Sequence, residues 1–178
     1  MNGRTPTAAV HSLRDALQLA LSCVTNGVLI TSQGGHAPAA AAHMLSLQGS
    51  PVRLAGEARV ALTVAHWYRL EEYIGVREPW RVQTTGYDYR LDGADGREIA
   101  SYHWHPEGAS HVVSPHLHLG AGAGALRREL TRAHFPTGWV MLPEVLRLAV
   151  ETFSVRPLRR DWSAILDRAQ AALGEPHG

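Results

Sequence analysis

Four histidines stand in two closely spaced pairs, and they are the residues of this sequence with the clearest chemical potential. His103 and His105 are separated by one residue, and so are His116 and His118. Alternate residues of a β-strand point to the same face of a sheet, so each pair brings two imidazoles together if its segment is a strand. Imidazole binds transition metals and also exchanges protons near neutral pH. Either chemistry could be carried by these two pairs.

The residues around the pairs predict a β-hairpin whose register is set by burial. With a turn over 106–111, His103 faces Ser114, and Ser101 faces His116. All four histidines then lie on one face of the hairpin, and a slip of one residue would mix them with apolar side chains. The apolar residues that share the opposite face in this register are Tyr102, Trp104, Val113, Leu117 and Leu119.

In this register only one histidine from each pair comes close to the other pair. His103 and His116 are diagonal neighbours, roughly 7–8 Å apart, and a four-histidine site would need a different register. A two-histidine site with a third ligand from elsewhere is therefore expected, and His111 and His134 are candidates for the third position. A divalent ion such as zinc, nickel or iron would be bound. The candidate ligands are His103, His105, His116, His118 and His134.

Two other interpretations of the histidines remain open at this point. In metal-free acid–base catalysis one imidazole removes a proton and its neighbour donates one, which is enough to cleave RNA if a cation binds the phosphate. The catalytic residues would be His103, His116 and His118, and the phosphate-binding residues would be Arg127, Arg128 and Arg132. In the other interpretation the histidines form only a solvated polar surface.

The pattern of apolar residues predicts an α+β domain that positions this hairpin. A helix is expected over 8–24, and two more begin near Pro143 and Asp161. Alternation predicts an antiparallel β-meander between them, with the N-terminal helix and the two C-terminal helices packed on one face. A single domain is expected over 1–178, with frayed ends at 1–7 and 174–178. The expected strands cover 28–32, 60–70, 81–91, 97–105 and 112–119.

Composition narrows the function classes. The chain of 178 residues has a formal charge of +1, and all its basic residues are arginine, which excludes a Schiff-base or Walker lysine. A lone cysteine, Cys23, excludes an intrachain disulfide framework and indicates a reducing compartment. No apolar run is long enough to span a membrane, and no secretory signal is evident, so a cytoplasmic protein is expected.

Part of the chain resembles a known family. The order Tyr-x-Tyr at 87–89, Tyr-His-Trp at 102–104, a turn, and Pro-His-x-His at 115–118 is similar to the core of TumE-like toxins from bacterial toxin–antitoxin pairs. The resemblance covers roughly residues 80–120. This chain lacks the Arg-x-Asp-Asn segment that the family would have between the aromatic strand and the histidines. It implies an RNA-directed toxin with an antitoxin partner, and a role first for His116 and His118, then for His103. The alternative class is a non-enzymatic, homo-oligomeric binding module.

Overall fold

The computed structural model describes residues 1–39, 41–106, 112–123 and 135–174, and these form an α+β fold. Within these ranges nine antiparallel strands make one sheet, in the order β2-β3-β5-β6-β7-β8-β9, with β1 paired to β6 and β4 paired to β5. The strands are β1 (Asn2–Gly3), β2 (Leu29–Thr31), β3 (His43–Leu47), β4 (Val52–Arg53), β5 (Ala61–Glu72), β6 (Trp80–Asp92), β7 (Glu98–Trp104), β8 (His116–Leu119) and β9 (Phe135–Pro136). The helices are α1 (Pro6–Leu21), the 3₁₀ turn η1 (Ala121–Ala123), α2 (Leu142–Glu151) and α3 (Trp162–Leu173).

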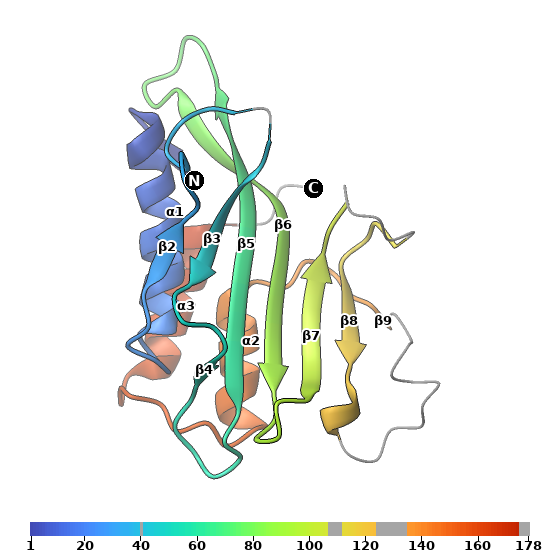
Figure 1. Ribbon diagram of the computed structural model, residues 1–178. Coiled ribbons are helices and arrows are strands. Elements are labelled where there is room, and N and C mark those ends of the chain that lie inside the picture. The colour runs from blue at the N-terminus through green and yellow to red at the C-terminus, as the bar shows by residue number, and fades with distance from the viewer. Residues whose placement is uncertain (40, 107–111, 124–134, 175–178) are drawn as a thin grey trace.

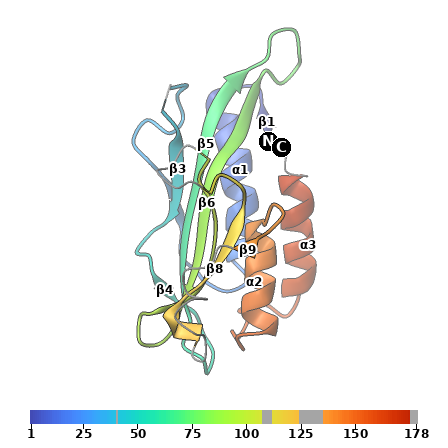
Figure 2. The same cartoon turned by 90° about the vertical axis from the view of Figure 1, so that its right-hand side faces the viewer.

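All three α-helices cover the same face of the sheet. Figure 2 shows α1, α2 and α3 on one side of the strands. In Figure 1 they lie behind β2 to β6, whereas β7, β8 and β9 extend beyond them. The expected architecture, a β-meander with one N-terminal and two C-terminal helices on one face, is therefore confirmed. The opposite face of the sheet carries no helix among the described residues.

The core lies between the helices and the sheet because both contribute one apolar face. Helix α1 buries a stripe of residues at helical spacing, and β5 and β6 bury alternate residues. Helix α3 packs against both α1 and α2, which closes the core from outside. The largest fully buried side chains are Tyr68, Tyr87, Tyr89, Leu17, Leu21, Leu45, Leu62, Leu91, Leu142, Leu146, Leu166 and Val10.

The N-terminal segment is held by strand pairing and by a helix cap. Residues 2 and 3, which we expected in a frayed end, pair with β6. Helix α1 begins at Pro6 rather than at residue 8, because the Thr5 hydroxyl accepts a hydrogen bond from the Ala8 amide at 3.1 Å and proline suits the first turn. Within the described residues, none of the helices combines the length and apolar character needed to cross a bilayer.

The hairpin that carries the histidines differs from the expected one in length. The strand expected over 112–119 begins only at His116. Pro115 has no amide hydrogen to donate to a ladder, and the strand starts directly after it. The connection between β7 and β8 is therefore longer than the predicted turn over 106–111, and this moves the register.

Candidate metal centre

The register of β7 and β8 places two histidines directly opposite each other. His103 pairs with His116, and Ser101 pairs with His118. The predicted pairing of His103 with Ser114 is thus wrong by two residues, because the connecting segment is longer than expected. A shift of two preserves which face each side chain points to, so the prediction that the histidines share one face is unaffected. The rings lie on the side of the sheet without helices.

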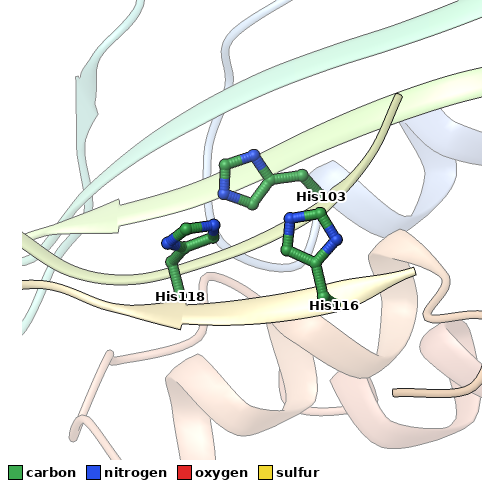
Figure 3. Close-up of side chains that lie close together, drawn as sticks. All are labelled: His103, His116 and His118. Carbon is green, nitrogen blue, oxygen red and sulfur yellow. The ribbon is translucent and has the colours of Figure 1, made fainter. Parts of the chain in front are cut away.

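Three imidazoles converge as a result of this register. The ring centroids of His103 and His116 are 5.1 Å apart, those of His103 and His118 are 4.5 Å apart, and those of His116 and His118 are 5.1 Å apart. Figure 3 shows His103 on β7 facing the two rings of β8. The third residue of the group, which we expected from a distant segment, is therefore His118 of the same hairpin.

The spacing of the ring nitrogens suits a metal ion. One ligand atom from each of the three histidines lies within 4.8 Å of the other two. Nitrogens bound to tetrahedral zinc at 2.0–2.1 Å are about 3.3 Å apart, so the rings would have to close by up to about 1.5 Å. The three histidines could hold a metal ion.

A backbone carbonyl fixes the tautomer of His116. Its Nδ1 lies 2.8 Å from the carbonyl oxygen of Ser114, an acceptor, so Nδ1 carries the hydrogen and donates it. The lone pair of the ring is then on Nε2. Metal-bound histidines commonly donate their other ring N–H to a carbonyl or carboxylate in this way. His116 is also only 4% exposed, which does not fit the interpretation of the histidines as a solvated surface.

His103 contributes a buried nitrogen without a hydrogen bond. Its Nε2 has no hydrogen-bonding partner among the described residues, although such an atom normally has one when buried. Burial, and the nearby His118, His116 and His105, lower the pKa of His103 to about 4, against the opposing effect of Asp88. The ring is therefore neutral at pH 7, the form that binds a metal.

A carboxylate of the neighbouring strand β6 and a hydroxyl of β7 itself support the three histidines. Asp88 of β6 pairs directly with His103, and its carboxylate accepts a hydrogen bond from the hydroxyl of Ser101 at 2.7 Å. Ser101 is fully buried. Sequence reasoning missed Asp88, although its alternation with Tyr87 and Tyr89 on a predicted strand already placed it on the histidine face.

The remaining predicted site residues lie apart from the three histidines or outside the described residues. His105 shares their face, but its ring centroid is 5.8 Å from that of His103, and it packs edge-on against Trp67 at 4.8 Å. It does not belong to the group of three. The other predicted site residues, which lie outside the described residues, are His111, His134, Arg127, Arg128 and Arg132.

Comparison of the chain with protein-family models, curated proteins and solved structures finds no match. The resemblance to TumE-like toxins therefore depends on the residues of the aromatic strand and the histidine hairpin alone.

Proposed function

We propose that His103, His116 and His118 bind a divalent transition metal, with zinc first among them, and that the protein is a metal-dependent hydrolase. The observation that carries this proposal is the convergence of three imidazoles around the unpartnered Nε2 of His103. A buried nitrogen with no hydrogen bond costs free energy, and a metal ion would recover it. Three neutral imidazoles are also a ligand set found in catalytic zinc sites.

The proposed chemistry follows from the number of ligands. When bound by three protein ligands, zinc keeps one position for water and lowers the pKa of that water to near 7. In this chain the Ser114 carbonyl holds His116 in the required tautomer, and Asp88 provides negative charge beside His103. The face carries no helix among the described residues.

RNA is the substrate that we propose for this hydrolase, with an antitoxin as its protein partner. The support is that the residues carrying the resemblance to TumE-like toxins, at 102–104 and 115–118, include the same three histidines that converge in space. The antitoxin partner, the homo-oligomer and the cytoplasmic location stay predictions.

Metal analysis of untagged protein tests the centre. We expect close to one equivalent of zinc per chain after purification or reconstitution, with His103→Gln and His116→Gln each reducing it strongly. His105→Gln is the matched control, because it removes an imidazole from the same strand and face but outside the group of three. Equal metal content in all three variants and the wild type would contradict the proposal.

An RNA cleavage assay tests the substrate separately from the metal. The zinc-loaded protein is expected to cleave single-stranded RNA, and both His116→Gln and removal of the metal should abolish cleavage. Metal binding without RNA cleavage would reject RNA while leaving the metal centre in place. Cleavage that survives removal of the metal but is lost in His116→Gln would instead indicate acid–base catalysis.

A further inference from the structure

A cavity of about 100 Å³ lies on the other side of the sheet, between the strands and the helices. We call it the His66 cavity. Its wall is mostly apolar and includes Leu13 and Leu17 of α1, Val82 of β6 and Leu142 of α2. The exposed residues Gln83 and Gly174 also line it and mark where it meets the surface. The cavity is thus an internal space with an opening, separate from the three histidines of the hairpin.

A buried histidine forms the polar part of the wall. His66 of β5 is only 5% exposed, and both its ring nitrogens are engaged. Nδ1 lies 2.7 Å from the hydroxyl of Tyr89, and Nε2 lies 3.0 Å from the hydroxyl of Thr84. All three side chains line the cavity. Burial lowers the pKa of His66 to about 4, so the ring is neutral at pH 7.

A count of hydrogens shows that this group has one donor to spare. A neutral imidazole donates from one nitrogen and accepts at the other. Of Tyr89 and Thr84, one hydroxyl therefore donates to the ring, and the other accepts from it. The hydroxyl that accepts still carries its own hydrogen, and among the described residues no further acceptor receives it.

A second hydroxyl of the wall is in the same situation. The Tyr87 hydroxyl accepts a hydrogen bond from the Val140 amide at 3.2 Å, and its own hydrogen has no acceptor among the described residues. Burial raises the pKa of Tyr87 and Tyr89, so both phenols keep their hydrogens at neutral pH. No Asp, Glu, Lys or Arg side chain lines the cavity within the described part of the chain, but Met1 does, and burial and then the nearby Arg81 lower the pKa of its amino group.

We propose that the His66 cavity binds a small neutral molecule with an apolar body and one carbonyl-type oxygen that accepts hydrogen bonds from the hydroxyls of the wall. The apolar lining favours a hydrocarbon body, and the cost of taking a charge out of water disfavours an ion. The two spare hydroxyl hydrogens are matched by the two lone pairs of one carbonyl oxygen. An apolar cavity of about 150 Å³ holds the six carbons of benzene, so about 100 Å³ encloses roughly four heavy atoms, and the rest of a small ring extends into the opening.

A matched pair of probes tests this proposal on the full-length protein. Cyclopentanone has the expected carbonyl oxygen, and methylenecyclopentane has the same shape with a CH₂ group in its place. Both are titrated into ¹⁵N-labelled protein, and binding is followed by the amide shifts of Thr84 and Val140. We expect saturable binding of cyclopentanone at these amides. Failure of cyclopentanone to bind there would overturn the proposal.

Variants separate the hydrogen bonds from the shape of the cavity. The variants Thr84→Val and Tyr87→Phe are made separately. At least one of them should weaken binding of cyclopentanone by about two- to tenfold, the range expected for one hydrogen bond. Neither should weaken binding of methylenecyclopentane. Thr63→Val, on the opposite face of the neighbouring strand, is the control and should change neither. Equal losses for both probes, or none for cyclopentanone in either variant, would overturn the proposal.

A cavity-filling variant locates the binding. Val82→Phe adds a ring to the wall and should abolish binding of both probes, provided that the amide spectrum shows a folded protein. Retained binding in the folded variant would place the probes elsewhere and overturn the proposal. If Val82→Phe does not fold, Leu13→Phe fills the same space from α1.

Discussion

At the scale of single residues, the candidate metal centre depends on groups that do not themselves point at the metal. The Ser114 carbonyl selects the tautomer of His116, and the Ser101 hydroxyl holds the carboxylate of Asp88 beside His103. Such supporting groups orient the ligands and raise their basicity. Asp88 also supplies a negative charge that partly balances a divalent ion bound by neutral imidazoles.

The first prediction concerns Asp88. Asp88→Asn keeps the size of the side chain but removes its charge, and we expect zinc affinity to fall roughly 10- to 100-fold. Competition with a chromophoric chelator measures this affinity. Asp95→Asn is the control, because that carboxylate lies in the exposed turn after β6 and pairs with Arg97. Equal affinity in Asp88→Asn and the wild type would mean that Asp88 does not support the centre.

The second prediction concerns pH and His66. In the folded protein burial holds the pKa of His66 at about 4, whereas in the unfolded chain it is near 6.5. Between these values the unfolded chain binds a proton that the folded protein excludes. Above pH 6.5 the free energy of unfolding should therefore not be reduced by protonation of His66. As pH decreases from 6.5 to 4, it should fall by up to roughly 3 kcal/mol.

Denaturant unfolding at several pH values measures this effect. His103 has a similarly lowered pKa and contributes in the same direction, so the comparison needs a variant. His66→Gln can keep hydrogen bonds to both hydroxyls, and it should show a smaller decrease between pH 6.5 and 4 than the wild type. An unchanged decrease would assign the pH dependence to other groups.

At the scale of elements, three aromatic side chains pack together on the face of β7 that is turned toward the helices. The Trp104 ring lies 4.2 Å from that of Trp139 and 6.3 Å from that of Tyr87. The Trp104 indole N–H also donates to the Val113 carbonyl at 3.0 Å, which ties the connecting segment to β7. This packing holds the strand whose other face presents His103.

The third prediction compares the two faces of β7. Trp104→Ala should lower the free energy of unfolding by roughly 2–4 kcal/mol, near the low end for a tryptophan because the ring is only partly buried. His105→Ala, measured on metal-free protein, should cost less than about 1 kcal/mol. Urea unfolding measures both. Similar losses for the two variants would show that the histidine face serves mainly to stabilise the sheet.

The sequence was sufficient to predict the face that the residues of β7 and β8 occupy, but not the register of the two strands. Val113, which we expected on the apolar face, lies before β8 and is exposed. Alternation of Tyr102 and Trp104 with the histidines determines the face, and this survives a shift of two residues. The register depends on where β8 begins, and therefore on the conformation of the connecting segment around Pro115. No pattern of apolar residues encodes that length, so His118 was a candidate ligand but was not predicted to lie close to His103.

Other features depend on contacts between distant segments. The Ala-rich region after residue 37 is ambiguous between helix and strand by its pattern, yet β3 follows it and pairs with β5. The His66 cavity needs residues from β5, β6, α1 and the segment before α2 to come together. A single histidine in an apolar strand gives no local sign of such a cavity.

At the scale of the whole molecule, the three histidines lie where the sheet has the least support. The strands β7, β8 and β9 extend beyond the helices in Figure 1, and β9 has only two residues. A metal ion bound by histidines of β7 and β8 would join the two strands by coordination bonds, in addition to their backbone hydrogen bonds. Its binding free energy would then add to the stability of this part of the sheet.

The fourth prediction is that zinc stabilises the protein mainly at this edge. Zinc at 100 times its dissociation constant should add about 2.7 kcal/mol and raise the melting temperature by roughly 5–10 °C. Hydrogen exchange should slow most in β7 and β8 and least in β2. A chelator should reverse both effects, and His103→Gln should show neither. If zinc slowed hydrogen exchange equally in all strands, and did so in His103→Gln as well, zinc would bind elsewhere.

The close packing of Trp104 and Trp139 also has an optical consequence. Trp104 follows His103 directly in β7, so its fluorescence originates next to the proposed metal centre. Copper(II), which binds imidazole more tightly than zinc, has a partly filled d shell that accepts excitation energy, whereas zinc has a filled one. Copper should therefore quench this emission, and zinc should restore it only by displacing copper. The protein would then report the occupancy of its own metal centre without an added label.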